Sequence, residues 1–181
     1  MSLRATWIKS AGALVGLALL AGRPLPSLAS AMPAQTVAPL SPVERDVLNR
    51  LNAAREAAGV AAVRPAAEIS GIAQARSADM VARRYFAHEI PGCAASLDRC
   101  NVLGILDSRH VSYRWAGEIL EWNLFLTRFD QNQTDAMAVE DFLHSPLHRA
   151  ILLDPRYTEA GVGVAIGPDE KMLLTVVFLQ T

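Results

Sequence analysis

Three short stretches, far apart along the chain, each carry one side chain that can bind a metal or transfer a proton. They hold His88 in Tyr-Phe-Ala-His, Glu118 in Ala-Gly-Glu-Ile, and His148 in Ser-Pro-Leu-His-Arg. Imidazole nitrogens and carboxylate oxygens are the ligand atoms of catalytic zinc sites, and imidazole also carries protons near neutral pH. Apolar or turn-forming residues frame each of the three, which favours one shared pocket over scattered surface charge.

Two of these residues also have an ordinary structural interpretation. His88 follows two aromatic residues at the end of a predicted helix, where it could simply cap that helix. Glu118 lies in an otherwise apolar run, so it is either solvent-facing on an alternating strand or buried with a partner. Burial without a partner would cost at least several kcal/mol.

The histidine pair at 144 and 148 has the spacing of two metal ligands on one helix, but a proline lies between them. Pro146 removes a backbone donor and disfavours helical geometry at Ser145. The two rings are therefore not expected to share one helical face. We expect His144 to end one helix at the surface, Ser145 to cap the next, and His148 to lie in its first turn.

The elements that must position these residues can be identified from hydrophobic periodicity and from start and stop signals. Ser41, Pro42 and Glu44 form a capping-box start for the first helix, and Gly59 ends it. Further helices are expected at 66–84, 97–106 and 134–143, and strands at 111–122, 157–166 and 171–179, with a turn at 167–170. Helices packed around a few antiparallel strands give an α+β layered fold.

Taken in order, these motifs resemble the CAP superfamily (cysteine-rich secretory, antigen-five and pathogenesis-related-one proteins) in its compact bacterial form. The resemblance covers about Pro42 to Gln180 and includes the closing Gly-Val-Gly-Val run at 161–164. It implies a three-layer α-β-α sandwich with a central, mainly antiparallel sheet. It also implies a central cleft lined by His88, Glu118 and His148, where a divalent cation such as Zn²⁺ could bind.

The sequence departs from the family pattern at two places. The family usually has Gly-Glu-Asn-Ile around the glutamate, and here Ile119 stands at the asparagine position. Many members have a second glutamate in Trp-x-x-Glu before the second histidine, where this chain has Phe142 and Ser145. The usual set of four is therefore reduced to three, and no catalytic residue is assigned.

The first residues are typical of an export signal. Arg4 and Lys9 precede an uncharged apolar run at 11–21, and Ala29-Ser30-Ala31 resembles a small-residue cleavage site. The run is shorter than the roughly 20 apolar residues that span a bilayer, although an uncleaved anchor is the alternative. We expect residues 1–31 to be a signal peptide, 32–41 a flexible leader and 42–181 the CAP domain, secreted or periplasmic, with no transmembrane span after cleavage.

Charge and cysteine content narrow the possible partners. Cleavage after Ala31 would leave 150 residues and remove three cations, leaving 14 against 18 acids and a net charge of −4. No basic stripe remains, so nucleic acid is not an expected partner. Cys93 and Cys100 are an even, closely spaced pair in an exported chain, which favours a disulfide over a metal site.

The preferred hypothesis is an exported CAP-domain protein that binds a lipid, a cell-wall fragment or an extracellular protein at the cleft. One alternative is a metal-dependent hydrolase with His88 and His148 as ligands and Glu118 as ligand or base. Another is a structural extracellular module whose polar cluster only stabilises the fold. The sequence favours a binding role over catalysis, because no nucleophile elbow, P-loop or dinucleotide fingerprint is present.

Overall fold

The computed structural model describes residues 39–93, 97–124 and 131–181. The predicted signal peptide and residues 32–38 of the leader therefore lie outside the described residues. In chain order the elements are α1 (Pro42–Ala57), β1 (Arg64–Pro65), α2 (Ala67–Arg83), α3 (Val102–Ser108), β2 (Trp115–Leu124), α4 (Gln131–His144), α5 (Pro146–Leu152), β3 (Glu159–Ile166) and β4 (Lys171–Gln180). None of the helices in these ranges is long and apolar enough to cross a membrane.

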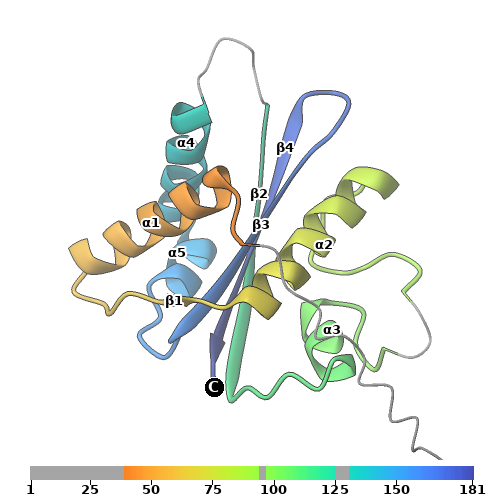
Figure 1. Cartoon of the computed structure of the whole chain (residues 1–181), viewed down its shortest axis with the longest axis horizontal. Helices are drawn as coiled ribbons and strands as arrows, with labels where there is room; N and C mark the ends of the chain where they lie inside the picture. Colours follow the sequence, from red (N-terminus) through yellow and green to blue (C-terminus); the bar gives the residue numbers. More distant parts are fainter. Residues whose placement is uncertain (1–38, 94–96, 125–130) are drawn as a thin grey trace, which may run out of the picture. The chain divides into compact units, whose positions relative to one another are not determined.

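A four-stranded sheet in the order β1-β3-β4-β2 forms the middle layer. Helices α1, α4 and α5 cover one face of the sheet, and α2 and α3 cover the other (Figure 1). The α+β three-layer prediction is thus confirmed. The sheet is mixed in detail, because β1 pairs with β3 in parallel while β2–β4 and β3–β4 are antiparallel.

Strand β4 separates the two cores of the domain. On one face Met172, Leu174, Val176 and Phe178 pack into the cluster shared with α1 and α4. On the other face, Val177 and Leu179 pack with α2 and α3, and Leu173 packs with Met80 of α2. A strand buried on both faces has a continuous apolar sequence, as residues 172–179 do, apart from Thr175.

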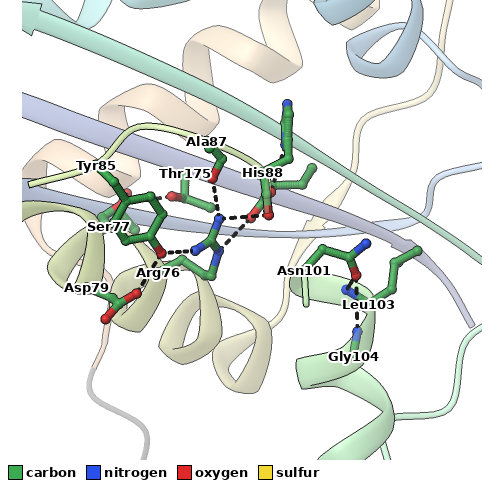
Figure 2. A network of polar contacts seen from close by, with 12 residues as sticks. Arg76, Ser77, Asp79, Tyr85, Ala87, His88, Asn101, Leu103, Gly104 and Thr175 are labelled. Carbon is green, nitrogen blue, oxygen red and sulfur yellow. Dashed lines mark hydrogen bonds and ion pairs between the residues drawn. The ribbon is translucent and has the colours of Figure 1, made fainter. Parts of the chain in front are cut away.

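The predicted helix starts are only partly right. Ser41 and Glu44 form both hydrogen bonds of the capping box at α1. Pro146 is the first residue of α5 and Ser145 is its N-cap, but the Ser145 side chain makes no capping hydrogen bond. The prediction that this hydroxyl caps the helix is therefore wrong. Helix α3 begins five residues later than expected, because the Asn101 side chain caps it through the amides of Leu103 and Gly104 (Figure 2).

Helix α2 lies unusually close to β3. A Cβ placed on Gly161 or Gly163 would collide with the α2 backbone at Ile69 and Gln74. The same contact is held by Ser77, whose hydroxyl donates to the Gly163 carbonyl (2.8 Å) and lies 2.9 Å from Thr175 Oγ1. The Gly-Val-Gly-Val run is therefore a packing requirement, and it fixes the height of α2 above the sheet.

The loop between α2 and α3 carries the predicted disulfide, which joins Cys93 and Cys100. Strand β2 begins at Trp115, four residues later than the predicted strand, and extends to Leu124. Because β2 is an edge strand, chain segments from either face of the sheet can approach it at its outer edge. The residues predicted to do chemistry lie on or beside this strand.

Candidate functional site

Glu118 is buried on the α2 side of β2, with only 7% of its surface exposed. Its Oε1 accepts a hydrogen bond from Arg76 Nε at 3.1 Å, and the Arg76 side chain is 1% exposed. Arg76 belongs to α2, where it occupies a position in the apolar stripe of that helix. The buried Glu118 requires a cationic partner, and the guanidinium of Arg76, from the helix that covers this face of the sheet, provides it.

His88 is joined directly to the same carboxylate. Its Nδ1 lies 2.8 Å from Glu118 Oε2, while more than half of the histidine side chain is exposed. Both carboxylate oxygens of Glu118 are therefore engaged, one by Arg76 and one by His88. A carboxylate that accepts from Nδ1–H fixes the ring orientation and leaves Nε2 as the imidazole nitrogen free to meet a ligand.

Arg76 also holds the chain segment that carries His88. Its Nη2 donates to the Ala87 carbonyl at 2.8 Å and to the His88 carbonyl at 3.3 Å, and its Nη1 donates to Tyr85 Oη at 2.6 Å (Figure 2). A single buried guanidinium thus holds three groups in place: the Tyr85 hydroxyl, the backbone carbonyls at 87–88 and the Glu118 carboxylate. Because Arg has five donors in a planar fork, it can do this where Lys could not.

The Tyr85 hydroxyl extends this network to the surface. It donates to Asp79 Oδ2 at 2.6 Å, and Arg83 donates to the same oxygen at 2.8 Å. Burial by itself would raise the pKa of Asp79, but these two hydrogen bonds and the positive charges of Arg83 and Arg76 together lower it. The network therefore ends in an ionised carboxylate rather than in an unpaired polar group.

His148 lies in the first turn of α5, as predicted, and packs edge-on against the Phe142 ring at 5.4 Å between centroids. Burial lowers the pKa of His148, and the electrostatic influence of the His88 imidazole lowers it further. The two imidazoles come from opposite sides of the sheet, since His88 follows α2 and His148 belongs to α5. At neutral pH the lowered pKa favours the uncharged imidazole, which is the form that accepts a hydrogen bond or binds a metal.

His144 lies apart from this cluster. It ends α4 in an exposed position, and its Nδ1 lies 2.8 Å from the Glu140 carbonyl oxygen. The predictions that His144 ends one helix at the surface and that His148 lies in the first turn of the next helix are both correct.

The predicted set of three does not fit a metal site with three protein ligands. Both Glu118 oxygens are occupied by Arg76 and His88. Within the described ranges, no three His, Cys, Asp or Glu side chains are grouped so that they could hold an ion together. The geometry suits Glu118 as a partner that orients His88.

The sequence profile of the cysteine-rich secretory protein family matches residues 48–180. The chain belongs to the CAP family. Uncharacterized protein YkwD of Bacillus subtilis (strain 168) is 29% identical over 124 residues, which are 68% of this chain and 43% of YkwD. The chain thus spans less than half the length of this relative.

Solved structures show the same fold. The extracellular protein containing an SCP domain from Bacillus anthracis str. Ames superposes with a TM-score of 0.61 at 21% identity, over 80% of this chain and 45% of that one. The crystal structure of NaASP2 with Zn²⁺ superposes with a TM-score of 0.54 at 10% identity, over 77% of this chain and 80% of that one. At these identities the likeness extends to the fold alone.

Within this CAP domain, sequence reasoning missed Arg76 and Tyr85 as parts of the site. Arg76 recurs at helical spacing with Ile72 and Met80 in α2, and nothing local marks it as the partner of a residue 42 positions away. The one available signal was indirect: a glutamate inside an apolar run requires a cation, and Arg76 is a charged residue on the apolar face of a helix.

Proposed function

We propose that this CAP domain is a binding module of an exported protein, and that its binding centre is the pair of imidazoles of His88 and His148. The supporting observation is the chain of contacts from Arg76 through Glu118 to His88. In this chain of contacts, a carboxylate held in a buried ion pair orients one half-exposed imidazole. Such a pair adds little net stability by itself, so its use to orient an exposed ring points to function.

The ligand classes that we propose are a lipid, a cell-wall fragment or an extracellular protein. His88 Nε2 and the uncharged His148 ring offer hydrogen bonds without a fixed charge, which suits a polar but neutral group on the ligand. Metal-dependent hydrolysis is less well supported, because the carboxylate that would act as ligand or base is already bonded to Arg76 and His88.

A divalent cation is a second candidate, favoured by one observation. A carboxylate bonded to Nδ1 of a histidine whose Nε2 is free is the arrangement that orients histidine ligands in metal sites. NaASP2, which shares the fold, was solved with Zn²⁺. In this chain His88 and His148 would hold such an ion, which would supply an electropositive centre for a ligand, and Glu118 would orient His88.

The two candidates can be separated with the full chain. We would titrate the demetallated protein with ZnCl₂ by calorimetry, and measure its co-sedimentation with purified peptidoglycan and with phosphatidylglycerol vesicles. The variants are His88→Ala and His148→Ala, and His144→Ala is the control because it is exposed and outside the cluster.

Loss of peptidoglycan or vesicle binding in both site variants, with His144→Ala unchanged, supports the binding centre. Zinc binding that is lost in the same two variants adds the cation. If wild type binds neither zinc nor any of these ligands, or if His144→Ala loses as much as the site variants, the proposal fails. If both site variants lose the cooperative unfolding of wild type, the result supports the alternative in which the polar cluster only stabilises the fold.

A further inference from the structure

A separate hollow of about 520 Å³ lies between the C-terminal end of α2 and the β3–β4 hairpin. It is lined by Met80, Val81, Arg84, Tyr85, Phe86, Trp122, Leu173 and residues of the hairpin turn. His88 and His148 are not among its lining residues, so it is distinct from the imidazole pair. Its volume is in the range of sites that hold small organic molecules.

The floor of the hollow is apolar and its mouth is aromatic. Met80 and Leu173 belong to the smallest of the three hydrophobic clusters and are buried. Phe86 and Trp122 are each 45% exposed, although they are large apolar side chains. Half-exposed rings beside an apolar floor leave surface that a bound ring could cover, and ring–ring contacts add to the stabilisation from area burial.

The charges at the rim are predominantly positive. Lys171 lies 5.3 Å from the centroid of the Trp122 ring and 3.4 Å from the carboxylate of Asp169. Arg84, which ends α2 in the left-handed conformation, forms no ion pair with any of the described residues. One cation at the rim therefore lacks a counter-charge, and a guanidinium matches a carboxylate or sulfonate through paired hydrogen bonds.

We propose that this hollow binds a small aromatic anion, with its ring between Phe86 and Trp122 over the apolar floor and its acidic group at Arg84. The three aromatic side chains that line the hollow favour a planar aromatic body over an aliphatic chain. The uncompensated charge of Arg84 favours one negative group. The inference is independent of the proposed function, because neither histidine of the imidazole pair takes part.

The test uses 2-naphthoate as the probe, titrated into the full chain by calorimetry, with 2-naphthalenemethanol as its uncharged analogue and dodecanoate as an aliphatic anion. Wild type should bind one equivalent of 2-naphthoate. Arg84→Gln should weaken that binding about tenfold or more, since it removes a charge-assisted hydrogen bond. Trp122→Ala should weaken it by a similar factor through lost ring contact.

Arg114→Gln is the matched control, because Arg114 is exposed and lies at the opposite end of β2. It should leave 2-naphthoate binding unchanged, and so should His88→Ala, which separates this hollow from the imidazole pair. Because Arg84 is exposed, Arg84→Gln should fold, and it tests the proposal even if Trp122→Ala does not fold.

Three results would overturn the proposal: wild type does not bind 2-naphthoate, the uncharged analogue binds equally well, or Arg114→Gln weakens binding as much as Arg84→Gln. Tighter binding of dodecanoate than of 2-naphthoate would also overturn it, because the occupant would then be an aliphatic amphiphile.

Discussion

The buried pair of Arg76 and Glu118 determines what the other site residues can do. Glu118 could have been a metal ligand or a general base, as the sequence suggested, but its two oxygens are used to hold Arg76 and His88. In the proposed binding centre, the groups left to bind a ligand are therefore imidazole nitrogens. A single arginine that no local motif identifies has changed the role of the carboxylate.

Breaking this pair should cost far more than breaking an exposed one. Arg76→Met leaves the Glu118 carboxylate buried without its cation, so we expect the free energy of unfolding to fall by about 3–5 kcal/mol. The matched control is Arg64→Met, since Arg64 pairs with Glu159 at 2.9 Å but its side chain is 75% exposed. That variant should lose less than about 1 kcal/mol. Equal losses in urea denaturation would contradict the interpretation.

A second buried carboxylate should make stability depend on pH. Asp135 of α4 is 1% exposed, and its carboxylate meets no hydrogen-bond donor among the described residues but faces the carboxyl group of Asp46. Burial first, and then the negative charge of Asp46, raises the pKa of Asp135 to about 6, against the opposing effect of Arg50. Because the folded-state pKa is above the unfolded value of 3.8, the stabilising contribution of protonated Asp135 is complete below pH 3.8 and is lost as the pH rises through 6.

Asp135→Asn should therefore remove this dependence and raise the free energy of unfolding at pH 8 by up to about 3 kcal/mol. Urea denaturation between pH 4 and pH 8 measures it. Asp98→Asn, at an exposed position, is the control and should leave the wild-type pH profile unchanged. An Asp135→Asn protein with the wild-type profile would show that Asp135 is not the responsible group.

At the scale of the elements, the predictions succeeded where the physical signal is local. The capping box at Ser41 and Glu44, the break at Pro146 and the hairpin at 167–170 each depend on neighbouring residues, and all three are present. The predicted positions of Glu118 on a strand and of His148 in a new first turn are also correct, whereas His88 lies in the loop after α2, four residues beyond the C-cap Arg84, and not at the helix end.

The features that the sequence did not predict, or predicted wrongly, depend on contacts between residues that are distant in the chain or on side-chain packing. β1 has two residues, Arg64 and Pro65, which is too short for any periodicity, and it exists because β3 offers a parallel partner. The Arg76–Glu118 pair likewise joins two elements that only the fold brings together. The hydroxyl of Ser145 stands at the predicted cap but makes no bond, which sequence cannot decide because side-chain orientation depends on packing.

The close approach of α2 to β3 gives a prediction for one glycine. A methyl group at Gly163 would meet the backbone of α2 at Ala73 and Gln74, which cannot move without shifting the helix. Gly163→Ala should therefore lower the midpoint of thermal unfolding and cost about 1–3 kcal/mol or more. Gly167→Ala is the control, since its nearest neighbour is the end of the Asp169 side chain, which can rotate away. Equal effects of the two variants would contradict this packing argument.

For the molecule as a whole, one covalent bond fastens the loop that connects α2 to α3. Replacing Cys93 and Cys100 by serine should lower the free energy of unfolding by about 2–3 kcal/mol, because the unfolded chain regains the freedom of the loop. Urea denaturation of wild type in the presence of dithiothreitol, which reduces the disulfide, should show the same decrease in the free energy of unfolding. No difference between the oxidised and reduced proteins would show that the bond does not contribute to stability.

In the proposed binding centre, two histidines from opposite layers of the CAP fold would meet beside the edge strand β2. His88 follows α2 on one face, and His148 begins α5 on the other. This arrangement depends on the whole domain, because neither layer contains both rings. A measured response of the His148 pKa to the loss of His88 would therefore show that the two rings lie near each other, as the proposed centre requires.

Titration of the four histidines by NMR, with His148 assigned by substitution, tests this convergence most directly. We predict that the pKa of His148 lies below 6.5 in wild type and rises when His88 is replaced by alanine, because one of the two causes of the shift is then removed. His110→Ala should leave it unchanged. A His148 pKa that does not respond to His88→Ala would show that the two imidazoles do not share a site, and the proposed binding centre would be wrong.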